Sequence, residues 1–267
     1  MVLRRVGNKA RIAKDVVKHF PPHKVYIEPF FGAGGIYFNK PKAQYNFLND
    51  LDDDVFNLFM VLKNQKQQLI EYFEEVPICE SLFKHWKQHK EKDAIPKAAR
   101  FLYLSNLGVL GKNDTLNIGL ENPLQILINN IIKYEDLNHS YFMNKDFRKI
   151  FDSIHVRNKN DNCKTFIYND PPYLATTSTY SVDKWNEQDL IDLFEENMKM
   201  AKRGAKFAIS EFENDLLLEL VEKYNLEIIN IGERQNLKNR RKEVMVVNYQ
   251  SPHIYGLFGT LNQNQTT

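Results

Sequence analysis

Short apolar runs alternate with amphipathic segments along most of this 267-residue chain. Seven runs are rich in β-branched and aromatic residues and are bounded by turn-forming residues, which is typical of strands. They are residues 24–31, 44–48, 140–143, 165–169, 206–210, 226–231 and 243–249. Apolar residues at helical spacing occupy residues 4–20, 52–62, 186–200 and 214–223. Strands that alternate with helices predict an α/β protein with a largely parallel sheet.

The last two predicted strands follow each other without a helix between them. Neighbouring strands without a crossover helix form a hairpin, so the final strand should be antiparallel. The sequence therefore predicts a seven-stranded sheet with an antiparallel terminal hairpin, unlike a plain dinucleotide-binding fold.

Residues 64–137 interrupt the alternation with helical patterns and no strand. We interpret them as an inserted helical domain, with residues 1–63 and 138–267 forming the α/β domain around it. Several lysines give this segment a basic character, and the glycines after residue 107 predict a loop or short hairpin.

The chain has 43% hydrophobic and 12% aromatic residues, which is ample for a packed core. Its 36 basic and 34 acidic residues give a formal charge of +2, which neither requires nor opposes a nucleic-acid partner. Cys79 and Cys163 form no Cys-x-x-Cys pair, and no apolar run is as long as a membrane span. We therefore expect a cytoplasmic protein that uses no metal and no membrane.

The predicted strand at residues 165–169 stops abruptly at Asp170-Pro171-Pro172-Tyr173. Two consecutive prolines donate no backbone hydrogen bond, so the strand cannot continue and carbonyl oxygens remain as acceptors. A carboxylate, these carbonyls and an aromatic ring suit a planar ring that carries an exocyclic amine, such as a nucleobase. A simple turn at the end of a strand would use the same residue types. A second motif is therefore needed to distinguish a binding site from a turn.

That second motif follows the first predicted strand, where Glu28-Pro-Phe-Phe precedes Gly32-Ala-Gly34-Gly35. A glycine-rich turn lets a nucleotide-like cofactor approach the backbone at the carboxyl edge of a doubly wound sheet. The spacing lacks the third glycine of the dinucleotide fingerprint and the lysine of a phosphate loop, which disfavours NAD and ATP. One strand on, Asp50 can bind a ribose hydroxyl pair, although it also suits the cap of the next helix.

Five short motifs, taken in this order, resemble the Dam-type adenine-N6 DNA methyltransferases. They are Gly7-Asn8-Lys9, the segment 28–35, Asn49-Asp50, Asn144-Lys-Asp-Phe147 and Asp170-Pro-Pro-Tyr173. The resemblance covers nearly the whole chain. It implies an S-adenosylmethionine-dependent, Rossmann-like methyltransferase fold, S-adenosylhomocysteine as the product, and a target-recognition role for the helical insert.

The same resemblance implies the cofactor-binding residues. Lys9, with Arg5 beside it, would pair with the methionine carboxylate of S-adenosylmethionine. Asp146 and Phe147 would hold its adenine, although Phe147 suits a core position equally well. The sulfonium favours an aromatic face, which Phe30 or Tyr180 would provide. The expected set is Arg5, Lys9, Glu28, Phe30, Gly32, Gly34, Gly35, Asp50, Asp146, Phe147, Asp170 and Tyr180.

Double-stranded DNA is the partner that the resemblance implies. The usual DNA-reading residues of the family are absent from residues 107–119, so the bases that are read stay open. The basic connection before the last strand is either a solvated turn or a clamp for DNA phosphates. The expected DNA-binding residues are Lys97, Lys112, Asn113, Arg234, Lys238, Arg240 and Arg241.

The expected catalytic residues are Asp170, Pro171, Pro172 and Tyr173, acting on an adenine flipped out of the duplex. The Asp170 carboxylate and the Pro171 carbonyl would accept its amino protons and aim the nitrogen lone pair at the methyl group. Tyr173 is expected to stack through its ring, not to act through its hydroxyl. The proton role of Asp170 stays open.

Two other functions stay open. A similar tetrapeptide would serve cytosine N4, RNA or protein glutamine as the methyl acceptor, and an inactive methyltransferase fold could serve as a DNA-binding subunit. Intact glycines together with Asp50 and Asp170 argue against the inactive subunit, since a binding module has no need of them together. A cognate restriction endonuclease is a further partner to consider, and a monomer or weak dimer is expected.

Overall fold

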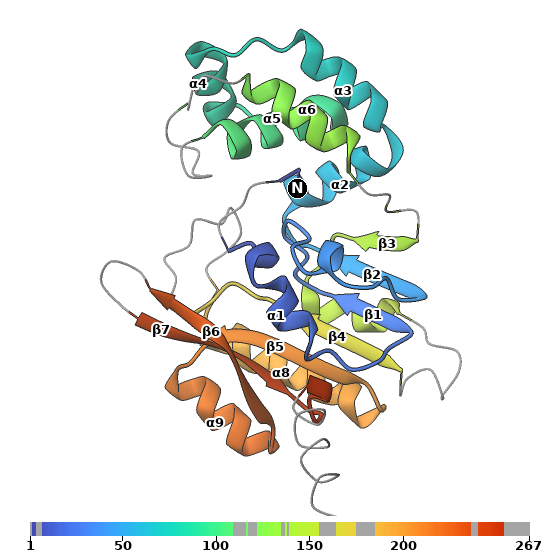
Figure 1. The fold of residues 1–267 in the computed structure, drawn as a ribbon, viewed down its shortest axis with the longest axis vertical. Helices are drawn as coiled ribbons and strands as arrows, with labels where there is room; N and C mark the ends of the chain where they lie inside the picture. The colour runs from blue at the N-terminus through green and yellow to red at the C-terminus, as the bar shows by residue number, and fades with distance from the viewer. Residues whose placement is uncertain are drawn as a thin grey trace, which may run out of the picture.

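A seven-stranded mixed sheet forms the centre of the protein in the computed structural model (Figure 1). The structure describes residues 2–3, 7–108, 116, 122–134, 137, 139–154, 164–174, 185–235 and 240–253, and only the backbone of residues 233–235 and 240. The strands are β1 (Val25–Glu28), β2 (Tyr45–Asn49), β3 (Ser140–Met143), β4 (Thr165–Asn169), β5 (Lys206–Phe212), β6 (Glu227–Gln235) and β7 (Arg240–Val247). The prediction of seven strands is confirmed.

The strand order is β3-β2-β1-β4-β5-β7-β6. The chain runs outward from β1 through β2 to β3 and then returns to β4 on the other side of β1. β1 and β4 are parallel, with Val25 opposite Thr165, and every residue of both strands is buried. Open α/β sheets bind ligands at the carboxyl ends of their strands where the order reverses, so the site is expected beyond Glu28 and Asn169.

The predicted antiparallel terminal hairpin is also confirmed. β7 lies between β5 and β6 and is antiparallel to both, with Val247 opposite Ala208 on one side and Glu227 on the other. The same register places Glu243 opposite Phe212, at the end of β5 that lies nearest the loop after β4.

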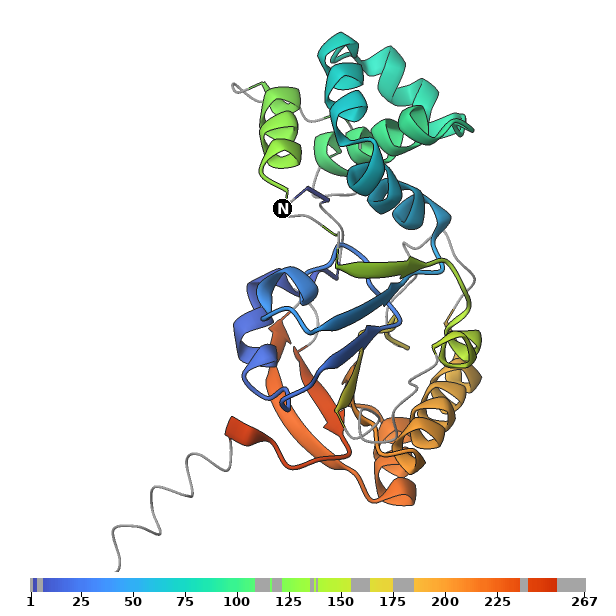
Figure 2. The same cartoon turned by 90° about the vertical axis from the view of Figure 1, so that its right-hand side faces the viewer.

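Helices cover both faces of the sheet (Figure 2). One face carries η1 (Lys9–Arg11), α1 (Ala13–Val17) and η2 (Tyr37–Asn39), and the other carries η4 (Phe147–Lys149), η5 (Phe151–Ser153), α8 (Glu187–Lys202) and α9 (Asp215–Tyr224). Alternate residues of β4 divide between the two cores: Phe166 and Tyr168 pack in the first and Ile167 in the second.

The amino-terminal helix is shorter than predicted. One amphipathic helix is expected over residues 4–20, whereas the described residues form the short η1 and α1. Asn8 caps η1 by accepting the Ala10 N–H at 3.0 Å, and Ile12, with ψ of 6°, separates η1 from α1. The glycine turn is likewise followed only by η2, because Pro41 and the start of β2 come within a few residues.

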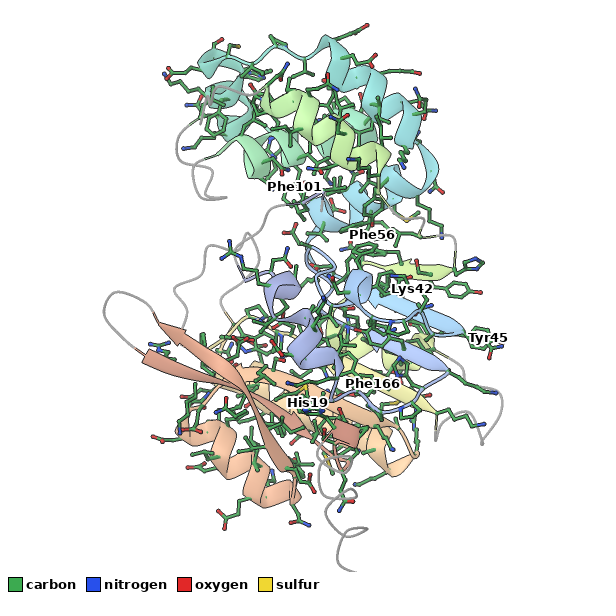
Figure 3. All side chains as sticks on the ribbon, viewed as in Figure 1. His19, Lys42, Tyr45, Phe56, Phe101 and Phe166 are labelled. Carbon is green, nitrogen blue, oxygen red and sulfur yellow. The ribbon has the colours of Figure 1, made fainter. Side chains whose placement is uncertain are left out.

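In the described part of the segment between β2 and β3 lie α2 (Asp53–Asn64), α3 (Lys66–Glu75), α4 (Glu80–Gln88), α5 (Ala94–Leu107) and α6 (Pro123–Ile132) (Figure 1). α2 packs against α5, and its Phe59 ring lies 5.4 Å from that of Phe142 in β3. Figure 3 shows Phe56 of α2 near β3, and Phe101 of α5 on the side of the helical group nearer the sheet. The helices share one hydrophobic core with the adjacent sheet face, so a separate recognition domain at residues 64–137 stays a prediction. None of the helices in the described ranges is long and apolar enough to cross a bilayer.

Asn49 holds together the loops at the carboxyl edge of the sheet. Its side chain is buried and its Nδ2 donates to the carbonyls of Pro29 and Lys145, both at 2.9 Å. Its Oδ1 accepts the Lys145 N–H at 3.0 Å. One amide side chain therefore connects the loops that follow β1, β2 and β3.

Replacing this amide by Asn49→Ala should lower the free energy of unfolding by roughly 2–4 kcal/mol, because backbone groups at a buried position lose their partner. Urea unfolding followed by circular dichroism measures the change. Asn57→Ala is the matched control, since it removes one exposed hydrogen bond to the Ala94 carbonyl. Equal losses in the two variants would contradict the role given to Asn49.

Candidate active site

Four polar atoms meet at the carboxyl edge of the sheet and form a closed ring. The Lys9 ammonium lies 2.7 Å from Asp170 Oδ1 and 3.1 Å from Glu243 Oε1. The Tyr173 hydroxyl lies 3.1 Å from the same Asp170 oxygen and 2.8 Å from the same Glu243 oxygen. We call these atoms the Lys9 ring. It joins η1, the loop after β4 and the start of β7.

Burial sets the electrostatics of the Lys9 ring. Lys9 is 3% exposed and Glu243 2%, whereas the Asp170 side chain keeps 19% of its surface accessible. Burial raises the pKa of the Asp170 carboxyl, an effect that the Lys9 ammonium opposes and the Glu243 carboxylate reinforces. Asp170 is therefore a better proton acceptor than an ordinary aspartate, and it is the only carboxylate of the ring that reaches the surface.

Tyr173 is held differently from the expectation. Its ring is 7% exposed, with the Lys9 ammonium 4.6 Å from its centroid and Phe212 packed edge-on at 4.7 Å. Burial raises the pKa of the Tyr173 phenol well above its ordinary value, so the hydroxyl keeps its proton. The hydroxyl contacts two carboxylates, which the sequence did not indicate. Stacking of the ring on a base stays a prediction.

Sequence reasoning missed Glu243 and Glu211. Glu243 begins a predicted strand and Glu211 directly follows one, and the available signal is an acidic residue next to an apolar run. Such a residue is expensive to bury without a partner and marks a site more often than a core position.

Asp50 holds the glycine-rich loop. Its carboxylate accepts the Gly32 N–H at 2.7 Å and the Asp52 N–H at 2.9 Å. The cap of α2 is Asp52, whose side chain accepts the Asp54 N–H, so the alternative role of Asp50 as a helix cap is wrong. Its contact with a ribose stays a prediction.

Gly35 leaves room for the amino-terminal segment that carries Lys9 to pack at the site. A Cβ atom on Gly35 would lie 2.2 Å from Asn8 Oδ1 and 2.9 Å from the Ala10 nitrogen. The segment that carries Lys9 can therefore pack here only against a glycine. A Cβ on Gly34 would strike the rings of Phe31 and Phe38, and the backbone there has φ of +72°.

Asp146 and Phe147 lie beyond β3, as expected. Asp146 caps η4 and pairs with Arg148 at 3.1 Å, and Arg148 also contacts Asp189 and Asp192 of α8. Phe147 is 5% exposed and packs in the second core, which supports the core alternative for its ring.

An aromatic cluster adjoins these residues. The ring of Phe30 lies 5.5 Å from Phe147 and 5.6 Å from Trp185. The buried indole N–H of Trp185 meets no hydrogen-bond partner among the residues that the structure describes. The structure thus brings Phe30 and Phe147 together and adds Trp185, which the sequence did not single out.

Glu28 and Glu211 are buried carboxyl groups near the Lys9 ring. Glu28 accepts the Tyr26 hydroxyl at 2.8 Å, and Glu211 Oε1 accepts the Phe212 N–H at 2.8 Å. Burial raises the pKa of each to about 8. Glu28 is 2% exposed, and its contact with the cofactor stays a prediction.

Several expected residues lie outside the described part of the chain: Arg5, Lys112, Asn113, Tyr180 and Lys238, together with the side chains of Arg234 and Arg240. Lys97 contacts Asp53 and Asp54 of α2, so its ammonium is occupied within the protein. The guanidinium of Arg241 lies 5.8 Å from the Phe212 ring, beside Tyr173. In the described ranges, no group of three His, Cys, Asp or Glu residues could hold a metal.

The raised pKa of Glu211 predicts a pH effect on stability. Its pKa is 4.5 ordinarily and about 8 in the folded protein, so between these values the folded state holds a proton that the unfolded state has released. The stabilisation is complete below about pH 4.5 and is lost as the pH rises through about 8. Between these pH values, Glu211→Gln should reduce the slope of the unfolding free energy against pH by up to about 1.4 kcal/mol per pH unit.

Urea unfolding at a series of pH values tests this expectation. Glu213→Gln, an exposed position two residues along, is the matched control. Burial also raises the pKa of Glu28 to about 8, so part of the pH dependence remains in the variant. A slope in Glu211→Gln equal to that of the wild type would show that Glu211 is ionised in the folded state.

The chain is similar to curated DNA methyltransferases over nearly its whole length. It is 24% identical to the type II methyltransferase M.MjaIII of Methanocaldococcus jannaschii, over 92% of this chain and 98% of the relative. It is also 24% identical to the DNA adenine methylase of Vibrio cholerae, over 94% of this chain and 96% of the relative. Among solved structures, an rRNA methylase of Streptococcus thermophilus aligns with 94% of this chain and 99% of its own, at 9% identity and a TM-score of 0.41.

The family match agrees with the five motifs. Residues 6–237 match the D12 class N6 adenine-specific DNA methyltransferases, a span that includes the glycine-rich loop, the helices before β3 and the Asp170 segment. The chain therefore belongs to the D12 class of N6 adenine-specific DNA methyltransferases.

Proposed function

We propose that this protein transfers a methyl group from S-adenosylmethionine to N6 of an adenine at a specific site in double-stranded DNA, with Asp170 binding the amine. The observation that carries the proposal is the position of Asp170. It follows β4 where the strand order reverses, keeps part of its surface accessible, and contacts the buried Lys9 ammonium.

The residues present fit the cofactor. A Cβ on Gly32 would meet no atom within 4 Å, so the backbone at this turn is open to a ligand. Asp50 lies beside it and fixes the loop. Lys9, Gly34 and Asp146 border the same edge of the sheet. S-adenosylmethionine supplies a methyl group on a sulfonium, an electrophile that requires no protein nucleophile.

The chemistry assigned to the chain is positioning and proton acceptance. An adenine amine is a poor nucleophile because its lone pair is delocalised into the ring. Hydrogen bonds to Asp170 and to the Pro171 carbonyl favour a pyramidal nitrogen with a directed lone pair. The raised pKa of Asp170 suits it to take the proton that the nitrogen loses on methylation.

The family match and the helices between β2 and β3 support DNA as the target. α4 carries Lys84 and Lys87 on its exposed side, and Lys90 follows it. We propose that this segment contacts DNA phosphates and that the target base is flipped into the site. Participation in a restriction system, a monomeric or weakly dimeric state and a cytoplasmic location stay predictions.

Methyl transfer to DNA is the direct test. Unmethylated phage λ DNA is incubated with tritium-labelled S-adenosylmethionine, and the labelled nucleosides are separated. We expect N6-methyladenine as the labelled product. Asp170→Ala should lower the single-turnover rate roughly a hundredfold or more. Labelled N4-methylcytosine, or label only on added RNA or protein, would replace the proposed target.

Lysine substitutions test the DNA contacts. Lys87→Ala with Lys90→Ala should weaken DNA binding and reduce the salt slope, by roughly one unit per lost phosphate contact. Lys97→Ala should leave that slope unchanged and lower stability instead, because its ammonium pairs with Asp53 and Asp54. Fluorescence anisotropy at several salt concentrations measures both. A slope that falls only for Lys97→Ala would move the DNA contact to α5.

A further inference from the structure

The Tyr173 hydroxyl has two carboxyl neighbours in the Lys9 ring but only one proton to donate to them. The Tyr173 hydroxyl carries one proton and lies within hydrogen-bond distance of two carboxyl oxygens, Asp170 Oδ1 and Glu243 Oε1. It can donate fully to only one of them. The other contact becomes a hydrogen bond when that carboxyl is protonated and donates to the tyrosine oxygen. The geometry therefore accommodates one additional proton, on either side of Tyr173.

The two carboxyl groups differ in their access to a substrate. Asp170 follows β4 and keeps 19% of its side-chain surface accessible, whereas Glu243 in β7 keeps 2%. A group that binds the amine can therefore reach Asp170 and not Glu243. Tyr173 therefore connects the accessible acceptor, Asp170, to the buried acceptor, Glu243.

We propose that Tyr173 and Glu243 form a proton relay, which moves the proton released by the methylated amine from Asp170 to Glu243. The proposal rests on the proposed function and deepens it, because it assigns the fate of the proton and gives two residues a role in the same reaction. Glu243 touches no substrate, so it acts as a positioning residue through Tyr173.

The steps balance without a further reactant. The N–C bond forms as the S–C bond breaks, with the bonding pair leaving on sulfur, and the nitrogen becomes cationic and acidic. Its N–H bond breaks, the electron pair stays on nitrogen, and Asp170 takes the proton. Asp170 then gives a proton to the Tyr173 oxygen while Tyr173 gives its own to Glu243. The products are a neutral methylamine, a neutral sulfide, an ionised Asp170 and a protonated Glu243.

The charges around the ring agree with this path. Lys9 is the cation shared by the two carboxylates, so the ring carries a net charge of −1 before reaction. A positive charge enters as a sulfonium and remains as a proton, which neutralises that excess. Among the described residues, Glu28 of β1, Tyr168 of β4 and Glu211 of β5 also interact electrostatically with the Lys9 ring. Burial keeps all three neutral at pH 7, so they do not hold the proton in place of Glu243.

Two substitutions break the relay at different places. Tyr173→Phe keeps the aromatic side chain and removes the hydroxyl. Glu243→Gln keeps an oxygen for Lys9 but cannot take a proton. Because the nitrogen becomes acidic as the N–C bond forms, proton loss accompanies methyl transfer. Each variant should therefore lower the single-turnover rate on λ DNA roughly tenfold, and the double variant should be no slower than either single one.

The controls separate a relay from a purely structural ring. Tyr168→Phe removes another buried hydroxyl, which contacts Ser210 at 2.9 Å, and should leave the rate unchanged. The wild type should show a solvent deuterium isotope effect on the single-turnover rate that is lost in both relay variants. Additive losses in the double variant, or an isotope effect retained in Tyr173→Phe, would overturn the relay.

A measurement on the isolated protein does not depend on turnover. Infrared spectroscopy follows the carboxyl band of Glu243 as the pH is changed, and the band is identified by its loss in Glu243→Gln. The pH midpoint of this titration should shift in Tyr173→Phe. An unshifted titration would overturn the proton connection. If wild-type protein leaves λ DNA unlabelled while the titration shifts in Tyr173→Phe, the proposed function is wrong, but the proton connection between Tyr173 and Glu243 is supported.

Discussion

Burial of the Lys9 ammonium is the constraint on which the site depends. A charge removed from water costs several kcal/mol unless close partners replace its hydration. Lys9 finds these partners in Asp170, 161 residues along the chain, and in Glu243 of β7. The segment that carries Lys9 reaches them only because Gly35 has no side chain to meet Asn8. The glycine-rich loop therefore serves the packing of the amino-terminal motif as well as the approach of a ligand.

The sheet order explains why distant residues converge here. β1 and β4 are neighbours with parallel register, so the glycine-rich loop and the Asp170 segment leave the same edge side by side. β7, inserted antiparallel beside β5, brings its first residues to that edge. An all-parallel sheet would place the last residues of a strand there. The antiparallel strand thus supplies Glu243 from the beginning of β7, together with Arg241 near Phe212.

Much of the fold and part of the site follow from the sequence alone. Apolar runs of strand length that end in Glu28, Asn49 and Asn169 indicate where the chemistry lies, because a strand that stops at a polar residue marks the carboxyl edge. The partners of that chemistry could not be predicted. Glu243 lies in a predicted strand, but its contact with Tyr173 depends on the pairing of β5 with β7. Lys97 looked like a DNA contact because a charge on a helix is read as exposed, whereas packing of α5 on α2 places it beside two aspartates.

The Lys9 ring also explains why the tetrapeptide at residues 170–173 carries limited information by itself. Its carboxylate and carbonyl can bind any planar amine, and its aromatic ring can stack on any base. The hydroxyl of Tyr173 gains a function only when a second carboxyl group lies within reach, and here that group comes from another strand, 70 residues away. A protein with the same tetrapeptide but an apolar residue at the start of β7 would retain amine binding and lose the inner proton acceptor. The chemistry of this site is therefore set by the pairing of the sheet as much as by the motif.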